Sequence, residues 1–383
     1  MSGADKELPE RAERVHREAL VIDTHSDTTW RFLNPEWDFT ARHDDGHMDL
    51  PRMRQGGIDA QFFAVCKARA HAQGETDLLK QALDMIDGVH CAVRRYPDAL
   101  ALATTAGEVR TAVSEGKVAA VIAIEGGYLI EDDLRLLRTY YRLGARAMTL
   151  THGFHTTWAD SSGVGVPLEP KHGGLTDFGR EVVREMNRLG MMVDVSHVAE
   201  STVRDALEVS SAPLLASHSG CRALADHPRN ISDEMIQAMA ERGGVIQTIF
   251  FPMFIDPEKV RLGRELRPRF EALQERRGDD ADALREERRR LYREIADAPS
   301  PASIVVDHIE HVIALVGDDH VGLGADWDGV AFMPQGMEDC SKLPYITLEL
   351  LRRGHSETTI RKVLGENTLR LMEEVERASE LVK

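Results

Sequence analysis

Residues 191–220 read MMVDVSHVAESTVRDALEVSSAPLLASHSG and contain two short apolar runs, each closed by a Ser-His pair. The pairs are Ser196-His197 and Ser217-His218, and residues 199–209 between them carry apolar side chains at helical spacing. The pattern predicts a strand, a helix and a second strand, and a connection of this length favours parallel strands. Histidines at the same end of two neighbouring parallel strands would lie over one rim of a sheet, where α/β folds usually gather metals and reacting groups. We therefore interpret His197 and His218 as a pair of metal ligands.

The composition narrows the class of protein and its partners. The chain has 383 residues, 42% hydrophobic and 29% charged, so it can bury a large core, and α/β barrels of this length occur as one domain. The 47 Lys and Arg residues against 64 Asp and Glu residues give a net charge of −17, which disfavours nucleic acid or an anionic membrane as a partner. No apolar run approaches the roughly 20 residues that cross a bilayer.

Two features of the sequence predict the compartment. Residues 1–20 lack the apolar segment of a secretory signal. The four cysteines, Cys66, Cys91, Cys221 and Cys340, show no C-x-x-C spacing, and we interpret them as thiols that form no disulfide in a reducing environment. A cytoplasmic location is therefore expected.

Six further apolar runs have the length and the bounds of buried strands, and helical patterns separate most of them. Together with the first two they give strands at 19–25, 58–65, 117–125, 145–152, 191–195, 213–216, 244–251 and 320–326. Eight strands that alternate with helices predict an α/β fold, a (β/α)8 TIM barrel, which we take as a single domain over residues 1–383.

One stretch interrupts this pattern between the seventh and eighth strands. Residues 257–300 are almost entirely charged, with sparse apolar positions. They predict an inserted helical hairpin, acting either as a lid over the strand ends or as an oligomer contact; a merely solvated excursion is the alternative. We also expect the chain to form a homodimer.

Potential metal ligands stand where the predicted strands end: His25, Asp27, Glu125, His152, His197, His218 and Asp326. In a TIM barrel these ends share one face. His25 and Asp27, at positions i and i+2, would project to the same side, although Asp27 alone could simply cap a helix. Glu125 is followed by two glycines, which suggests a close approach of the backbone, although it could also be an acid at a helix N-terminus.

This set of side chains suits two divalent cations per chain, with zinc the expected ion and positions left open for water. Glu125 is the candidate bridging carboxylate. Water held between two such ions ionises near neutral pH, and the resulting hydroxide can attack a carbonyl that the ions polarise. Asp326 is then left as the acid–base that takes a proton from this water and gives it to a leaving amine.

The motifs resemble those of the renal (membrane) dipeptidase family, a branch of the amidohydrolase superfamily with a binuclear zinc TIM barrel. The resemblance runs from about residue 21 to residue 330 and rests on VIDTHSD, IEGG, LTH ending at His152, EMNRLGMMVDVSH, SHS, HPRN and GLGADWDG. It implies that His25 and Asp27 hold one zinc ion, that His197 and His218 hold the other, and that Glu125 bridges them.

The resemblance also implies how the substrate is held. His152 would contact the scissile carbonyl oxygen, Arg229 the terminal carboxylate, and Asn230 of the same HPRN motif would be a further substrate-binding residue, while Asp326 would shuttle the proton. Phe254 stands where the family has a substrate-binding tyrosine, which leaves the substrate open. Ala145 and Ala147, smaller than the family's usual residues, concern barrel packing.

These observations predict a zinc-dependent dipeptidase that cleaves L-Xaa-D-Xaa or L-Xaa-L-Xaa dipeptides with a metal-bridging hydroxide. The nearest alternative is an N-acyl-D-amino-acid deacylase, which needs the same metals and a free carboxylate on its substrate. A non-catalytic metal-binding module is a more remote alternative, because no ligand is missing. For Arg229 the alternative role is an ion pair with Asp226 or Asp233 that only stiffens its loop.

Overall fold

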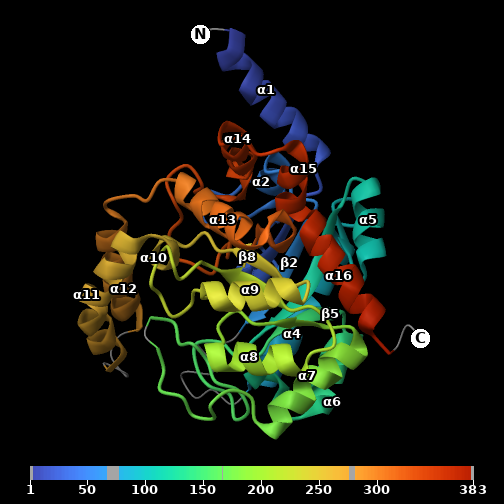
Figure 1. Cartoon of the computed structure of the whole chain (residues 1–383), viewed down its shortest axis with the longest axis vertical. Helices are drawn as coiled ribbons and strands as arrows, with labels where there is room; N and C mark the ends of the chain where they lie inside the picture. Colours follow the sequence, from blue (N-terminus) through green and yellow to red (C-terminus); the bar gives the residue numbers. More distant parts are fainter. Residues whose placement is uncertain (1–2, 67–76, 166, 276–280, 381–383) are drawn as a thin grey trace.

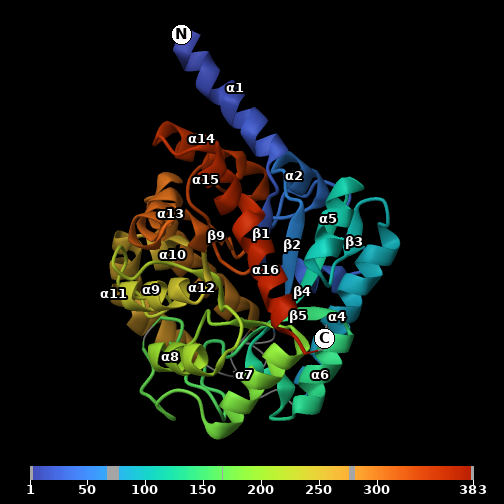
Figure 2. The ribbon, with the colours of Figure 1, turned by 45° about the vertical axis from the view of Figure 1, so that its right-hand side comes forward.

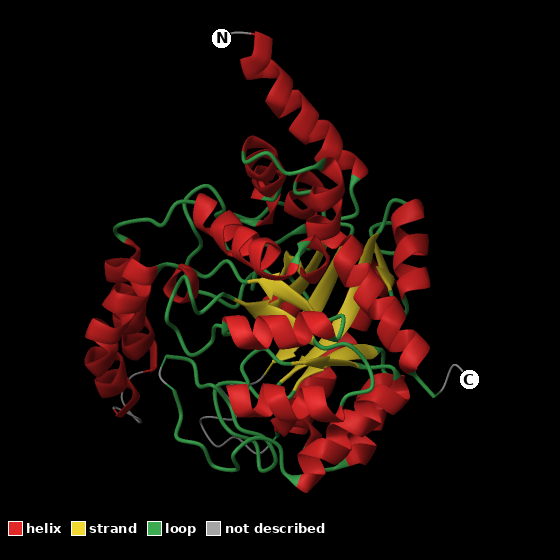
Figure 3. Ribbon diagram, in the orientation of Figure 1, coloured by secondary structure: helices red, strands yellow, loops and turns green. Residues whose placement is uncertain are grey.

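A closed parallel barrel forms the centre of the molecule. The computed structural model describes residues 3–66, 77–165, 167–275 and 281–380. The strands are β1 (Ile22–Ser26), β2 (Ala60–Cys66), β3 (Leu100–Leu102), β4 (Val118–Glu125), β5 (Ala145–Thr149), β6 (Met192–Asp194), β7 (Leu215–Ser219), β8 (Val245–Thr248) and β9 (Val321–Leu323). Their pairings are parallel, and the pairing of β2 with β4 closes eight of them into a barrel. The helices surround the strands (Figure 3), which confirms the predicted (β/α)8 TIM barrel.

The short strand β3 is not among the predicted strands. It pairs with the first half of β4, where Leu100 is in register with Val118, while the second half of β4 pairs with β5. The strand therefore extends the sheet outside the closed ring. Three residues are too few to show an alternating pattern, so the periodicity of the sequence gives no signal for it.

Strand β4 shows how the apolar runs create the barrel. All of its residues are buried, as expected for a strand covered on both faces. Its side chains alternate between two hydrophobic clusters, with Val121 and Ala123 in one and Ile122 and Ile124 in the other. Glu125 continues the row of Val121 and Ala123, and this alternation directs its carboxylate toward the barrel axis.

Helices connect most of the strands, and the predicted helix at residues 199–209 is present as α8 (Glu200–Val209). The described helices are α1 (Gly3–Glu18), α2 (Leu50–Gln55), α4 (Leu78–Arg95), α5 (Ala106–Ser114), α6 (Leu134–Arg142), α7 (Asp177–Leu189), α8 (Glu200–Val209), α9 (Asp233–Glu241), α10 (Pro252–Ile255), α11 (Pro257–Glu275), α12 (Ala281–Ala296), α13 (Ser303–Val316), α14 (Pro344–Arg352), α15 (Glu357–Arg361) and α16 (Asn367–Ala378), with short 3₁₀ turns such as η1 (Asp27–Leu33) between them. The first turns of α1 project away from the barrel (Figures 1 and 2). Within the described residues, no helix has the length and apolar character needed to span a bilayer.

Helix α6 begins directly after a left-handed turn. Glu131 and Asp132 adopt left-handed backbone angles, with φ of 47° and 55°, so they cannot belong to a right-handed helix. Asp133 then caps the helix by accepting a hydrogen bond from the backbone N–H of Arg135.

The charged stretch forms the predicted hairpin, in which α11 and α12 lie side by side at the edge of the molecule (Figure 1). The buried amine of Lys259 donates to the carbonyl oxygens of Ile295 and Ala298, which joins the two ends of the hairpin. On α11, Arg264 donates to Asp226, a residue of the loop that follows β7. The hairpin therefore contacts a loop at the carboxyl end of the barrel, while its role as a lid or an oligomer contact stays a prediction.

Candidate metal centre

All seven predicted ligands and acid–base residues lie together at the carboxyl ends of the strands. His25 lies in β1, Glu125 ends β4 and His218 lies in β7, while Asp27, His152, His197 and Asp326 follow β1, β5, β6 and β9. Distances of 2.8–3.8 Å between their nitrogen and oxygen atoms join them into one cluster. The structure thus brings together side chains that are up to three hundred residues apart in the chain.

The carboxylate of Glu125 is the centre of this cluster. Its Oε1 atom lies 3.5 Å from Nε2 of His25, 3.6 Å from His152, 3.1 Å from His197 and 3.4 Å from His218. The Nε2 atoms of His197 and His218 are 2.8 Å apart. One buried oxygen is therefore surrounded by four imidazole nitrogens from four different strands, a position suited to a carboxylate shared between two cations.

A second group of acids lies on the other side of His25. Its Nε2 atom is 3.8 Å from Oδ2 of Asp27 and 3.8 Å from Oδ1 of Asp326. Gly329 makes this approach possible, because a Cβ atom there would lie 2.1 Å from each of the same two carboxylate oxygens. The two acids are therefore held where any side chain at residue 329 would displace them.

Local irregularities of the backbone direct several of these side chains toward the cluster. The pairing of β1 with β2 shifts register between Asp23 and Ser26, and that of β7 with β8 shifts between Ala216 and Ser219, so His25 and His218 each lie where the regular strand pairing is interrupted. His197 and Asp326 have left-handed backbone angles, with φ of 66° and 68°. Non-glycine residues rarely adopt this conformation, and such strain clusters at functional sites.

The two ring nitrogens of His152 have different roles. Its Nδ1 atom accepts a hydrogen bond from the backbone N–H of Gly153, at a distance of 2.6 Å. A neutral imidazole accepts on one nitrogen and carries its proton on the other, so Nε2 of His152 bears the proton. This nitrogen faces the cluster as a hydrogen-bond donor to oxygen, which suits the predicted contact with a carbonyl and not metal ligation.

The electrostatics of the cluster reflect deep burial and crowded acids. Burial raises the pKa of Glu125 to about 8, opposed by the charge of His25 and reinforced by Asp27 and Asp326. Burial also raises the pKa of Asp326 to about 7. For His25, burial lowers the pKa, but the three carboxylates outweigh it and bring the value to about 10. The protein itself therefore supplies too little positive charge to keep all these acids ionised at neutral pH.

The residues fit bound cations. The Nε2 atom of His25, which faces the cluster, is buried without a hydrogen-bond partner within the described residues, although buried polar atoms are normally satisfied. Among the described residues, three sets of donor atoms lie within 4.8 Å of one another: His25, Glu125 and His218; His25, Asp27 and Asp326; and Cys66, Glu125 and His152. Imidazole nitrogens and carboxylate oxygens are the ligands that zinc and similar divalent ions take in proteins.

Arg229 provides a positive group beside the cluster. Its side chain is buried, and Nη2 donates to the carbonyl oxygen of His218 at 3.1 Å, while Nε and Nη1 have no partner in the described structure. Burial lowers the pKa of Arg229 to about 10, which leaves it charged at neutral pH. The alternative ion pairs are absent from the described part of the chain, because Asp226 bonds Arg264 and Asp233 bonds His311. The unpaired donors are free to receive an anion.

Asn230 and Phe254 occupy the surroundings of Arg229. The amide nitrogen of Asn230 donates to the carbonyl oxygens of Ala225 and Phe254, and its oxygen accepts from the N–H of Gly220. Both N–H groups of this amide thus hold the loop, and a contact of Asn230 with substrate stays a prediction. The ring of Phe254 lies 5.6 Å from the guanidinium carbon of Arg229 and has no hydroxyl to offer a ligand.

Cys66 also lies at this site, although it is not among the predicted site residues. It ends β2 in register with Glu125 at the end of β4, and its sulfur lies within 4.8 Å of donor atoms of Glu125 and His152. The thiol hydrogen-bonds to the Glu125 carboxylate and lowers the pKa of that group. The predicted strand 58–65 stopped one residue short; a polar side chain directly after an apolar run was the available signal.

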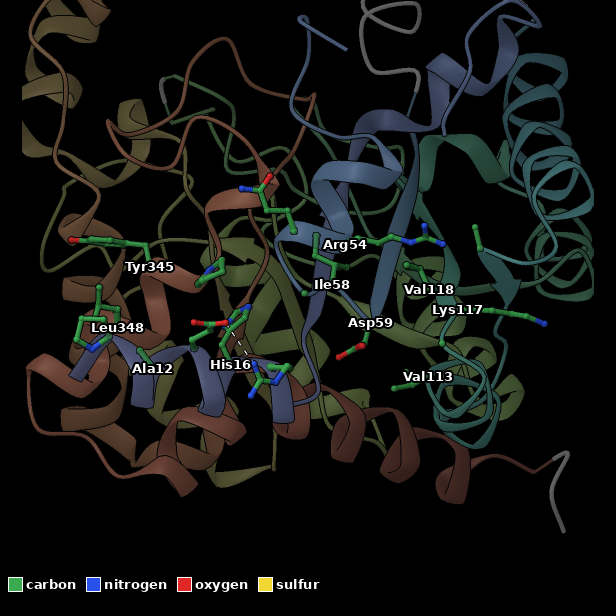
Figure 4. A pocket seen from close by; sticks show the side chains of 18 residues that line it. Ala12, His16, Arg54, Ile58, Asp59, Val113, Lys117, Val118, Tyr345 and Leu348 are labelled. Carbon is green, nitrogen blue, oxygen red and sulfur yellow. Dashed lines mark ion pairs between the residues drawn. The ribbon is translucent and has the colours of Figure 1, made fainter. Parts of the chain in front are cut away.

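A separate cavity of about 660 Å³ lies at the opposite end of the barrel (Figure 4). It is lined near the start of β2 by Ile58 and Asp59, near the start of β4 by Lys117 and Val118, and by side chains of α1 and α14. In TIM barrels this end serves stability and the carboxyl end carries the chemistry. The cavity is therefore not part of the metal centre.

The fold and the cluster of imidazoles and carboxylates define the class of metal-dependent (β/α)8 hydrolases. Comparison with known proteins then gives the family. The chain belongs to the membrane dipeptidase family, peptidase family M19, whose sequence model matches residues 9–383. The predicted resemblance is confirmed, and the chain is a member of a metallopeptidase family.

Individual relatives support this assignment. The chain is 34% identical over 347 residues to the dipeptidase verJ of Clonostachys rogersoniana, covering 88% of this chain and 78% of that protein. It matches the crystal structure of the probable dipeptidase PvdM from Pseudomonas aeruginosa with a TM-score of 0.83 and 27% identity, over 98% of this chain and 100% of that chain. A metallo peptidase from Rhodobacter sphaeroides, liganded with a phosphinate mimic of the dipeptide L-Ala-D-Ala, matches with a TM-score of 0.76 and 27% identity, over 93% and 99% of the two chains.

Proposed function

We propose that this chain is a binuclear, zinc-dependent dipeptidase that cleaves L-Xaa-D-Xaa and L-Xaa-L-Xaa dipeptides. One observation carries the proposal: four histidine Nε2 atoms approach a single oxygen of Glu125 within 3.1–3.6 Å. The dipeptide mimic bound by the Rhodobacter sphaeroides relative supports this class of substrate.

The ligands divide into two groups around Glu125. His25 and Asp27 would hold one ion, and His197 and His218 the other, with Glu125 shared between them. When bound, two divalent ions polarise a scissile carbonyl and lower the pKa of a water molecule so that it can act as the nucleophile. The Nε2 atom of His25, which is buried without a hydrogen-bond partner in the described residues and lies 3.8 Å from Asp27, supports the first pair, and the 2.8 Å between the Nε2 atoms of His197 and His218 supports the second.

The remaining residues act on the substrate. His152 presents its Nε2 proton to the carbonyl oxygen, where negative charge develops in the transition state. Arg229 offers Nε and Nη1 to the terminal carboxylate, and a planar guanidinium can bind a carboxylate through two parallel hydrogen bonds. Asp326 faces the cluster next to His25 and can accept a proton and return it to the leaving amine.

A substrate comparison tests the proposal against the alternatives. Purified protein loaded with zinc is assayed with L-Ala-D-Ala, L-Ala-L-Ala and N-acetyl-D-alanine, and the release of free amino acid is measured. We expect cleavage of the dipeptides with a higher kcat/KM than that of the acyl amino acid. Faster release from N-acetyl-D-alanine would instead identify a deacylase, and no hydrolysis of any substrate by fully metallated protein would indicate a non-catalytic binding module.

We also propose a cytoplasmic location, which the four thiols of Cys66, Cys91, Cys221 and Cys340 support, and a homodimeric assembly. Sedimentation velocity of the purified full chain distinguishes a dimer of about twice 42.7 kDa from a monomer of that mass.

A further inference from the structure

The carboxylate of Asp194 joins three strands directly beneath the metal centre. Asp194 is buried at the end of β6, and its Oδ1 atom accepts from the backbone N–H groups of Ser196 (3.0 Å) and Ser217 (2.9 Å). Its Oδ2 atom accepts from the hydroxyls of Thr149 at the end of β5 and Ser217 of β7. The two oxygens thus receive four hydrogen bonds, and all four donors come from residues next to the histidine-bearing strand ends.

The bond from Ser217 determines which nitrogen of His218 carries the proton. A serine hydroxyl has one proton, and Ser217 gives it to Asp194 at 2.6 Å. The Oγ atom of Ser217 also lies 2.8 Å from Nδ1 of His218, and it can only accept there. Nδ1 of His218 must therefore bear the proton, which leaves a lone pair on Nε2, 3.4 Å from Oε1 of Glu125.

His152 and His218 are consequently fixed in opposite tautomers. His152 accepts at Nδ1 from the backbone and presents a proton to the cluster, whereas His218 donates at Nδ1 and presents a lone pair. A metal can bind only the second form, because the coordinating nitrogen must be unprotonated. The hydrogen bonds around the two rings therefore make His152 a hydrogen-bond donor to the substrate and leave His218 able to bind a metal ion.

We propose that Asp194 and Ser217 are positioning residues of the metal centre, which set the tautomer of His218 through a carboxylate–hydroxyl–imidazole chain. This inference rests on the proposed metal-dependent function. Partners that orient a ligating histidine typically contribute about 10- to 100-fold to metal affinity. Neither residue touches the position that a substrate would occupy in this account, so both act through His218.

The variants Ser217→Ala and Asp194→Asn interrupt the chain in different ways. Ser217→Ala removes the acceptor of the Nδ1 proton. In Asp194→Asn the amide can donate to Ser217, whose own proton then turns toward Nδ1 of His218 and places the imidazole proton on Nε2. The matched control is Ser219→Ala, because Ser219 is also buried in β7 and its hydroxyl contacts Ser196 but no imidazole.

Two measurements read the effect without relying on turnover. In metal-free, ¹⁵N-labelled protein, long-range ¹H–¹⁵N spectra report the tautomer of His218, whose signals are assigned by their loss in His218→Gln. Competition with a chelator gives the affinity for zinc. We expect the Nδ1–H form in wild type and in Ser219→Ala, the Nε2–H form in Asp194→Asn, and zinc affinity lowered about 10- to 100-fold in Asp194→Asn and Ser217→Ala. Ser217→Thr, which restores a hydroxyl, should recover most of the affinity.

The inference fails if wild-type His218 carries its proton on Nε2, or if folded Ser217→Ala binds zinc as tightly as wild type. If Asp194→Asn does not fold, the pair Ser217→Ala and Ser217→Thr still decides the question. A protein that shows the expected tautomer and zinc affinities but hydrolyses no dipeptide would refute the proposed function and leave this inference standing.

Discussion

The sharpest test of the substrate site concerns Arg229 and the free carboxylate of a dipeptide. The perturbation is twofold: Arg229 is changed to Met, which keeps an unbranched side chain without its charge, and the substrate is changed to its C-terminal amide. If Arg229 binds the carboxylate, amidation should lower kcat/KM strongly in wild type and hardly at all in Arg229→Met. The coupling between the two changes isolates the pairwise interaction.

The structure sets the magnitude of this coupling. Arg229 is buried and has two donor nitrogens without a partner in the described residues, so the carboxylate would form charge-assisted bonds that solvent screens little. A hydrogen bond to a charged group contributes about 1.5–3 kcal/mol. Because about 1.4 kcal/mol corresponds to a tenfold change, amidation should reduce kcat/KM about 10- to 150-fold in wild type.

Steady-state kinetics with L-Ala-D-Ala and its amide on metal-loaded proteins provide the assay. Arg264→Met is the matched control, because Arg264 bonds Asp226 on the same loop but lies on the exposed surface. It should retain the full effect of amidation. Arg229→Met loses the hydrogen bond to the carbonyl oxygen of His218 but also removes a buried charge, so its thermal midpoint should change little. Equal losses on amidation in wild type and Arg229→Met, or a strongly destabilised variant, would assign Arg229 a structural role.

Three further predictions concern the metal centre. Glu125→Gln should weaken the binding of both ions, because a neutral amide cannot bridge two cations as a carboxylate does; elemental analysis that finds no more than one tightly bound ion in wild type would contradict the shared site. Asp326→Asn should retain its metals and fold, since Asn tolerates the left-handed φ of 68°. Its turnover should fall at least about a hundredfold, because the acid–base group is lost. Near-normal turnover would assign the proton transfer to another group. Gly329→Ala should lower the affinity for at least one ion about tenfold or more, because its Cβ would lie 2.1 Å from oxygens of Asp27 and Asp326. Gly165→Ala, whose Cβ would meet no atom within 4 Å, is its control, and unchanged metal content in both variants would show that the acids relax freely.

Much of the fold could be read from the sequence because buried parallel strands are unbroken apolar runs. The run from Val118 to Glu125 is buried at every position and was recognised almost to the residue. Short elements were harder to recognise, since Leu100–Leu102 is too brief to show any period. The start of α6 is equally hard to predict, because the left-handed turn at Glu131 and Asp132 contains no glycine that would mark it.

The members of the metal centre could be predicted because they share one property, a polar side chain directly after an apolar run. Cys66 met this criterion but was passed over because β2 was ended one residue early. The hydrogen-bond and ion-pair partners of the polar residues around this centre are harder to predict from the sequence. The spacing of residues in the sequence does not predict that the amide of Asn230 donates to a carbonyl of its own loop. It also does not predict that Asp226 pairs with Arg264 and Asp233 with His311. Such pairings depend on which side chains meet in three dimensions.

The periodic pattern of the sequence does not predict the direction in which each imidazole points. An ideal strand would alternate its side chains, yet strand pairing shifts register beside His25 and His218, and His197 adopts a left-handed φ of 66°. These departures bring rings from separate strand ends to one oxygen of Glu125. Hydrogen bonds at Nδ1 of His152 and His218 then decide whether each of these two rings offers a proton or a lone pair. Sequence motifs therefore locate the candidate metal centre, whereas the register shifts, the strained φ angles and residues such as Asp194 give its histidines different chemical roles.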